Sequence, residues 1–255
     1  MSEMNGKKVV LEISHLHKKY DENAVIDDLN LKVYEGEVIV IVGSSGCGKS
    51  TLLRCINLLE DIQGGEIKLY GEIISNRKKN LSEIRQKIGM VFQNYELFPH
   101  KNVLDNIILA PIKVQKREKS EVIEEAKVLL KRVGLEDKIY SMPSQLSGGQ
   151  KQRVAIVRSL CMHPEILLFD EVTASLDPEM TREVLEVILE LASSKKTMIV
   201  VTHEMQFARA VADRIIFIDE GKIIEENTAE EFFTSPKTEK AKAFMNTFTY
   251  KTKRK

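Results

Sequence analysis

The octapeptide at positions 43–50 constrains the fold of this chain more than any other part of its sequence. It reads Gly-Ser-Ser-Gly-Cys-Gly-Lys-Ser, follows the apolar run 38–42, and precedes a segment with helical apolar spacing over 52–56. Glycines between a strand and a helix allow successive backbone N–H groups to point at one anion beside the helix N-terminus. The sequence therefore predicts a phosphate-binding loop at a strand end in an α/β fold.

The residues of this loop have separate expected roles around a nucleotide. Lys49 is expected to reach the outer phosphates, and the Ser50 hydroxyl is expected to bind Mg²⁺. The full expected nucleotide-binding set from this segment is Gly43, Ser44, Ser45, Gly46, Cys47, Gly48, Lys49, Ser50 and Thr51.

A pair of carboxylates ends a second apolar run. Asp170 and Glu171 directly follow the run 166–169. Alone, acids at a strand end are more often a helix cap or salt-bridge partners, but a phosphate loop in the same chain reverses that balance. We expect Asp170 to hold Mg²⁺, usually through water, and Glu171 to polarise the attacking water as a general base.

Short apolar runs alternate with helical patterns along much of the chain. Four runs end beside polar or glycine residues, as buried parallel strands do when ligands bind at their carboxyl ends; they are 38–42, 166–169, 198–201 and 215–218. Shorter alternating runs near the beginning predict antiparallel strands at 9–13, 26–33 and 66–70. Apolar faces predict one helix through 122–133, ended by Gly134, and another through 184–191.

These patterns predict an α/β fold with a P-loop NTPase core, a mostly parallel sheet, an antiparallel β subdomain and an inserted α-helical subdomain. The nucleotide-binding core with the β subdomain is expected over 1–93 and 164–255. The helical subdomain is expected over 94–163, where the strand pattern vanishes.

Composition excludes several classes of protein. Lys plus Arg and Asp plus Glu both number 38, so no global basic field exists and nucleic acid is not an expected partner. The apolar runs are far shorter than the roughly 20 residues of a membrane-spanning helix. The first ten residues lack the pattern of a secretory signal, so we expect a cytoplasmic protein whose three cysteines are reduced.

A second anion site is expected at the start of another helix. Ser147 is a natural N-cap, and Gly148 and Gly149 leave the first N–H groups open to an incoming phosphate. The segment Leu-Ser-Gly-Gly-Gln at 146–150 resembles the signature sequence of ABC ATPases, and the similarity extends over nearly the whole chain. This resemblance implies that 1–255 is a single ABC ATPase domain that hydrolyses ATP with Mg²⁺.

The resemblance also implies roles for four single residues. Tyr20 is similar to the aromatic residue that stacks on adenine, and His203 to the switch histidine that reaches the terminal phosphate. Gln93 resembles the loop glutamine that contacts Mg²⁺ or the attacking water. Asp177 resembles the aspartate that couples the two active sites of a dimer.

Proteins of this family pair head to tail, so we expect a homodimer or a pairing with an equivalent subunit. The signature residues of one subunit would close over the ATP held by the other; they are Ser147, Gly148, Gly149 and Gln150. Val172 stands where many members have proline, and Ala174-Ser175 reverses the commoner order, but no catalytic group is lost. Cys47, where serine is frequent, suggests sensitivity to thiol reagents.

Within the family, the segments 53–60 and 92–100 look like those of polar amino-acid importers. This implies a subunit on the inner face of the cell membrane, bound through separate permease subunits that dock near 95–100, and indirectly served by a solute-binding protein. Import of another solute, such as a metal, lipid or drug, is the main alternative. A soluble ABC ATPase acting on nucleic acid or ribosomes is less favoured, because the chain has no tandem unit, coiled coil or basic arm.

Overall fold

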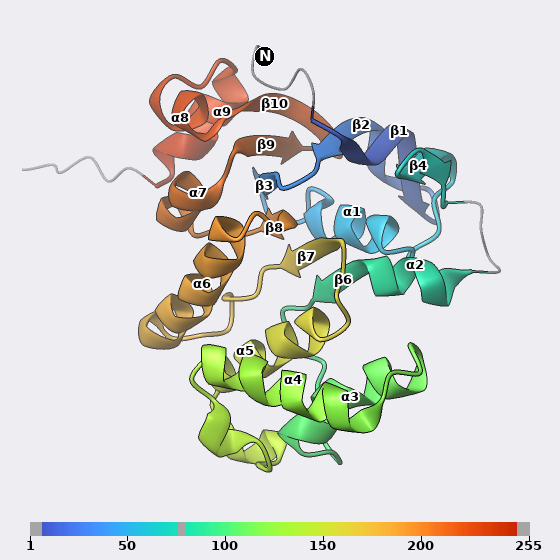
Figure 1. Ribbon diagram of the computed structural model, residues 1–255. Helices are drawn as coiled ribbons and strands as arrows, with labels where there is room; N and C mark the ends of the chain where they lie inside the picture. Colours follow the sequence, from blue (N-terminus) through green and yellow to red (C-terminus); the bar gives the residue numbers. More distant parts are fainter. Residues whose placement is uncertain (1–6, 76–79, 249–255) are drawn as a thin grey trace, which may run out of the picture. The chain divides into compact units, whose positions relative to one another are not determined.

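The computed structural model describes residues 7–75 and 80–248, which form two compact units (Figure 1). The first unit consists of two separate segments of the sequence, Met1–Lys79 and Thr197–Lys255. The second unit is the continuous segment Asn80–Lys196. We describe each unit in turn.

An antiparallel sheet in the first unit has the strand order β2-β1-β4-β5. The sheet alternates buried and exposed side chains, as expected when one face packs on a core. The three antiparallel strands predicted from sequence are confirmed, although Tyr70 lies beyond the end of β4, and the short β5 was not predicted. The strands are β1 (Val9–Tyr20), β2 (Asn23–Tyr34), β4 (Gly64–Leu69) and β5 (Glu72–Ile73).

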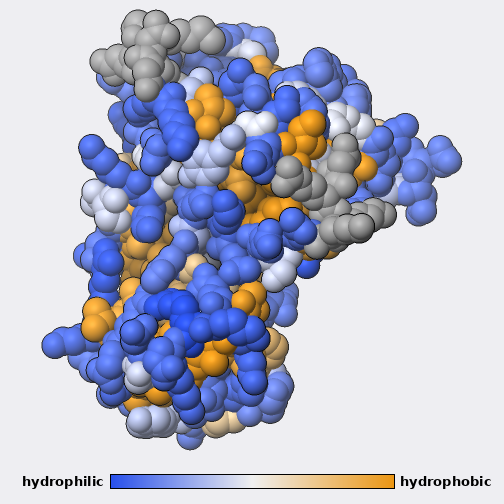
Figure 2. Space-filling model, turned by 45° about the vertical axis from the view of Figure 1, so that its right-hand side comes forward, coloured by the Kyte–Doolittle hydropathy of each residue, from blue (hydrophilic) through white to orange (hydrophobic). Residues whose placement is uncertain are grey.

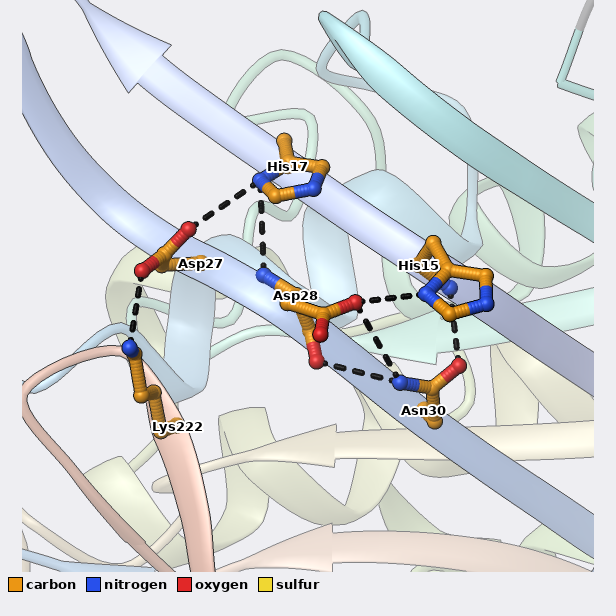
Figure 3. A network of polar contacts seen from close by, with 6 residues as sticks. All are labelled: His15, His17, Asp27, Asp28, Asn30 and Lys222. Atoms are coloured by element: carbon orange, nitrogen blue, oxygen red, sulfur yellow. Dashed lines mark hydrogen bonds and ion pairs between the residues drawn. The ribbon is translucent and has the colours of Figure 1, made fainter.

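Register shifts interrupt the pairing of β1 with β2 at four places, and a polar network lies along this pair of strands (Figure 3). His15 and Asp28 both have left-handed φ angles, and His15 Nδ1 lies 2.6 Å from Asp28 Oδ1. The hydrogen bond to His15 lowers the pKa of Asp28. Lys222 Nζ lies 2.9 Å from Asp27 Oδ2 and so joins β10 to β2.

The remaining strands of the first unit form a mostly parallel arrangement around a buried central strand. β3 (Val38–Gly43) is buried at every position and runs parallel to both β8 (Thr197–Val201) and β9 (Arg214–Asp219). β10 (Lys222–Thr228) pairs antiparallel with β9. It was not predicted, because charged residues interrupt its apolar pattern. The helices of this unit are α1 (Lys49–Ile56), α7 (Met205–Val211), α8 (Ala229–Thr234) and α9 (Glu239–Asn246).

The second unit combines two parallel strands with helices. β6 (Ile88–Val91) pairs with β7 (Ile166–Asp170), and every residue between 94 and 163 is described and none is a strand. The α/β fold class predicted from sequence is confirmed, while the exact subdomain borders at 94 and 163 stay a prediction. The helices are α2 (Leu81–Lys87), α3 (Val103–Lys113), α4 (Lys119–Arg132), α5 (Gly148–Leu160) and α6 (Pro178–Ser193), with short 3-10 turns at Glu136–Lys138 and Pro143–Gln145.

Both predicted helical faces are present in the second unit. α6 buries Val184, Val187, Ile188 and Leu191. α4 buries Val122, Ala126 and Leu130, and Gly134 follows it with a left-handed φ of 67°. Because glycine adopts this conformation without strain, the chain can turn away there.

The surface contrasts with the apolar strands. The face in Figure 2 is mainly hydrophilic, with hydrophobic side chains gathered in small patches, as is normal for a folded protein surface. Within the described residues, no helix combines the length and the apolar character needed to cross a membrane. Cys47, Cys55 and Cys161 are buried free thiols, as predicted.

A buried ion pair connects the start of β3, which leads into the phosphate loop, with the start of β9. Glu37, fully buried just before β3, faces Arg214 at the start of β9, with Nε–Oε1 and Nη2–Oε2 distances both of 3.0 Å. Arg214 also contacts Glu226 at 2.6 Å. The Nη2–Oε2 contact is a hydrogen bond, whereas the Nε–Oε1 contact is an ion pair whose two atoms make no hydrogen bond among the described residues.

Replacing Glu37 with glutamine is expected to lower the free energy of unfolding by about 3 kcal/mol, because a buried guanidinium would lose its main counter-charge. The loss lies at the low end of the usual range because Glu226 still contacts Arg214. Glu35→Gln removes an exposed carboxylate and serves as the control. Urea unfolding followed by circular dichroism measures both variants, and equal stabilities would contradict this role of Glu37.

Candidate nucleotide-binding site

The phosphate loop joins β3 to α1, and two of its glycines are required by close backbone contacts. At Gly43 (φ 155°) a β carbon would lie 2.1 Å from the Ile218 carbonyl oxygen of β9. At Gly48 (φ 103°), the N-cap of α1, it would lie 2.8 Å from the Val25 carbonyl oxygen of β2. Any side chain at these positions would push the loop off the two neighbouring strands.

Lys49 is the cation of this loop. It is 4% exposed, and its Nζ donates to the carbonyl oxygens of Ser44 at 2.8 Å and Gly43 at 3.1 Å. The first turn of α1 contains no acidic residue, so no side chain of that turn offsets the positive end of the helix dipole. The Lys49 cation, the N-terminus of α1 and the backbone of the loop glycines can together bind a multiply charged anion, such as the phosphates of a nucleotide.

Cys47 is buried within the loop, and its backbone N–H donates to the Ser44 carbonyl at 3.4 Å. Burial raises the pKa of the Cys47 thiol, although the nearby Lys49 opposes the shift. A protonated, buried thiol reacts slowly. The thiol sensitivity expected from the sequence is therefore not supported by this environment.

Tyr20 lies at the end of β1 with 40% of its surface exposed. Lys18 Nζ sits 4.5 Å from the centroid of its ring. Lys18 is itself buried and donates to Glu60 Oε2 at 2.9 Å and to the Asp61 carbonyl at 2.8 Å. The ring is thus held on one side by a fixed cation, and its exposed surface is available to stack on a base.

His203 lies two residues beyond β8 and is exposed. The parallel register pairs Val201 with Ile41, so His203 follows β8 by the same number of residues as Gly43 follows Ile41. Thr202 shapes this turn, because its Oγ1 accepts from the Glu204 N–H at 3.0 Å. The first unit therefore brings His203 and the start of the phosphate loop to the same edge of its parallel strands.

In the second unit, the acidic pair stands at the end of β7. Asp170 is the last residue of the strand and is 4% exposed. Glu171 has a left-handed φ of 46°, a conformation that costs a non-glycine residue about 1–3 kcal/mol and is typical of functional sites. The separate roles expected for the two carboxylates stay a prediction.

Gln93 is exposed in a loop whose backbone accepts hydrogen bonds from side chains of α5. Gln152 Nε2 donates to the Phe92 carbonyl at 3.1 Å. Arg158 donates to the carbonyls of Tyr95 at 3.1 Å and Glu96 at 2.5 Å. Sequence reasoning missed Gln152 and Arg158, because nothing local connects them to a loop about 60 residues away.

The signature helix α5 begins as predicted. Ser147 is its N-cap, with Oγ accepting from the Gln150 N–H at 3.3 Å, and the Gln150 side chain accepts from the Ser147 N–H at 3.0 Å. This reciprocal capping box satisfies two backbone donors at once. The Ser147 cap expected from sequence is confirmed, and the partner role of Gln150 within the cap is new.

The two signature glycines are required by packing inside the second unit. A β carbon at Gly148 would lie 2.8 Å from Leu176 Cδ2, and one at Gly149 would lie 2.9 Å from Met180 Cβ. Asp177 is the N-cap of α6 and accepts from the Met180 N–H at 2.9 Å. Asp177 therefore has a structural role beside its predicted coupling role. The sequence contains a signal for this cap, because proline is common at the first position of a helix and Asp177 directly precedes Pro178.

Ser175 has a partner for its hydroxyl in this unit. The Tyr95 hydroxyl lies 3.2 Å from Ser175 Oγ, and it would also lie 3.0 Å from a β carbon at Gly148. The reversed Ala174-Ser175 order thus places a polar side chain where Tyr95 can bond to it. The loop of Gln93, the signature helix and the loop before Asp177 meet at Tyr95.

The chain matches a family model described as ABC transporter over residues 26–174, more than half of its length. A second model, described as AAA domain, putative AbiEii toxin, Type IV TA system, matches the shorter segment 142–209. The chain is 52% identical to the glutamine transport ATP-binding protein GlnQ of Bacillus subtilis, over 93% of this chain and 98% of that protein. It is 50% identical to the glutamate/aspartate import ATP-binding protein GltL of Escherichia coli, over 92% and 98%.

Solved structures agree with these similarities. The chain resembles cbiO1 of Clostridium perfringens, part of the ABC transporter complex cbiONQ, with a TM-score of 0.81 and 30% identity over 90% of this chain and 92% of that one. It also resembles a dimeric post-hydrolysis state of the ATP-binding cassette MJ0796 bound to ADP and Pi. That match has a TM-score of 0.78 and 34% identity over 86% of this chain and 98% of the other.

Two substitutions separate the cap role of Asp177 from its predicted coupling role. Asp177→Ala should lower the free energy of unfolding by about 1 kcal/mol, whereas Asp177→Asn should keep it, because asparagine caps equally well. Both variants should lose ATPase activity if the carboxylate couples two sites. Thermal melting and steady-state hydrolysis measure the two effects, and a fully active Asn variant would leave Asp177 only its cap.

Proposed function

The chain belongs to the ABC transporter family and hydrolyses ATP, and on this premise we propose that it drives uptake of a polar amino acid through a separate membrane permease. The observation that carries the proposal is about 50% identity, over more than nine-tenths of the chain, to ATP-binding proteins for glutamine, arginine and glutamate/aspartate transport. The predicted site residues lie at strand ends, at helix starts or in the loops that follow the strands, which supports this proposal.

ATP would bind with its phosphates on the loop from Gly43 to Thr51 and its adenine against Tyr20. Lys49 would move from the loop carbonyls to the outer phosphates. Ser50, Gln93 and Asp170 would hold Mg²⁺, since hydroxyl, amide and carboxylate oxygens are the donors this ion prefers. When bound, the ion neutralises charge on the phosphates.

Hydrolysis requires a base and a group that recognises the terminal phosphate. Glu171 would take a proton from the attacking water while the oxygen of that water bonds to the terminal phosphorus. The bond from that phosphorus to the bridging oxygen breaks, which leaves ADP and phosphate. His203 would hydrogen-bond the terminal phosphate, and Gln93 would position the water.

The signature helix would act on a second copy of this chain. In the proposed head-to-tail homodimer, Ser147, Gly148, Gly149 and Gln150 of one subunit would cover the ATP on the other subunit's loop. Asp177 would connect the two sites. Dimers are known for the related cassette bound to ADP and Pi.

The permease would dock on the loop between β6 and α3. This loop exposes Phe98, Pro99 and His100, and Phe98 is 41% exposed. Exposed aromatic side chains are enriched at the centres of protein interfaces. The subunit would thus sit at the inner face of the cell membrane, and a solute-binding protein would deliver the amino acid from the other side.

Glu171→Gln is expected to slow ATP hydrolysis by about 100- to 10,000-fold, because the amide cannot accept the proton from water. ATP affinity should stay unchanged. Glu179→Gln, an exposed carboxylate in the first turn of α6, is the matched control and should keep full activity. A Glu171→Gln variant that hydrolyses ATP at the normal rate would remove Glu171 from the mechanism.

The transport proposal is tested by purifying the tagged chain from detergent-solubilised membranes and identifying its partners. We expect to recover a small permease, and we expect the ATPase activity of its complex with this chain, in vesicles, to rise when a binding protein loaded with a polar amino acid is added. Recovery of ribosomes, DNA or no membrane protein would contradict the proposal. If a metal or a lipid stimulates the ATPase activity instead, the chain still belongs to an importer, but the transported solute is not an amino acid.

A further inference from the structure

The C-terminal helix α9 is fixed on the first unit at its beginning. Glu225 of β10 is 5% exposed, and its carboxylate accepts from the backbone N–H groups of Lys237 and Thr238 and from the Thr238 hydroxyl, each at 2.7 Å. Thr238 is the N-cap of α9. The Asn227 side chain donates a fourth hydrogen bond to this carboxylate, at 2.6 Å. The three hydrogen bonds from Lys237 and Thr238 hold the start of the helix in one place.

Apolar contacts fix the rest of the helix against β9. Ala241 is fully buried, and the Phe244 ring lies 5.1 Å from the Phe217 ring, centroid to centroid. Because α9 is held both at its cap and through its apolar face, the direction of its polar side chains is set by the fold.

Lys240 of α9 meets the carboxyl end of β9. Its Nζ lies 2.7 Å from Asp219 Oδ2 and 2.9 Å from Glu220 Oε2. Asp219 is the last residue of β9, and its side chain is 22% exposed, against 82% for Glu220. The hydrogen bond from Lys240 lowers the pKa of Asp219, so this carboxylate is ionised at neutral pH.

Asp219 in turn reaches the phosphate loop. Its Oδ1 accepts from the Ser44 hydroxyl at 3.3 Å, and Ser44 is the second residue of the loop. Ile218, the residue before Asp219, is the one whose carbonyl excludes a side chain at Gly43. The loop that must receive a polyanion therefore begins directly beside an ionised carboxylate, an arrangement that repels the ligand unless a cation offsets it.

We propose that Lys240 is a positioning residue for ATP binding: it neutralises Asp219 and holds it on Ser44, so that the C-terminal helix sets the affinity of the phosphate loop. Two polar contacts connect α9 to the phosphate loop, one between Lys240 and Asp219 and one between Asp219 and Ser44. Displacement of α9 would expose the Asp219 charge to the phosphates and weaken ATP binding without altering Glu171. The inference rests on ATP binding at this loop.

Lys240→Met removes the cation and keeps most of the side-chain volume. We expect the KM for ATP to rise about three- to tenfold, with kcat within about twofold, because one uncompensated charge near the phosphates acts on binding. The matched control is Lys242→Met, since Lys242 lies on the same helix and pairs only with the exposed Glu239 at 2.7 Å among the contacts described for it. Calorimetric titration with ATP measures binding directly.

Three further readouts separate charge compensation from a merely structural role. Adding Asp219→Asn to Lys240→Met should restore the KM, because the uncompensated charge is gone. Lys240→Arg should keep the wild-type KM, and the defect of Lys240→Met should shrink as salt is raised, since salt screens exposed charges. Melting temperatures of all variants identify any that fail to fold.

The outcomes are distinct. Equal KM values for Lys240→Met and Lys242→Met, in a wild-type background that binds ATP, would overturn this inference alone. A double variant as weak as Lys240→Met would also overturn it, because the Asp219 charge would then not be the cause. Failure of the wild-type chain to bind ATP would instead refute the proposed function.

Discussion

The close approach of the Gly43 backbone to β9 is the constraint on which the rest of the first unit depends. A β carbon at position 43 would lie 2.1 Å from the Ile218 carbonyl oxygen, so β3 can lie beside β9 in this register only with glycine there. The Val25 carbonyl oxygen of β2 would lie 2.8 Å from a β carbon at Gly48 and 2.5 Å from one at Gly221, in the β9–β10 turn. The phosphate loop is therefore shaped by backbone contacts with strands from both sheets.

Helix α5 has the corresponding organising role in the second unit. Its first turn carries the capping box, its glycines fit against α6 and Leu176, and its middle and end hold the loop of Gln93 through Gln152 and Arg158. Three segments with predicted roles at the nucleotide thus share one rigid support. A movement of α5 would shift the signature residues together with the loop on which we propose that the permease docks, and this would couple ATP hydrolysis to transport.

Local patterns allowed most of the fold to be predicted from the sequence. The phosphate loop, the buried parallel strands and the Ser147 cap each depend on residues that are neighbours in the chain, so spacing alone reveals them. β10 was missed because its charged residues hide the strand pattern. Lys240, Asp219 and Ser44 were missed as a group because their contacts join residues up to 175 positions apart, and no local pattern reports such a contact. The roles assigned to Tyr20, Gln93 and His203 came from family resemblance, since no spacing rule singles out one such residue.

We propose that each ATP site is shared between two copies of this chain, and dimers that combine two different variants distinguish a shared site from a site within one chain. Lys49→Ala subunits lack a working phosphate loop, and Ser147→Arg subunits lack a working signature helix; both are placed in a Glu171→Gln background that traps ATP. Neither subunit alone should trap ATP, but a dimer of one with the other contains one intact site and should trap one ATP. If the mixed dimer traps none while a dimer carrying only Glu171→Gln traps two, the two halves of each site belong to the same chain, and the shared site is refuted.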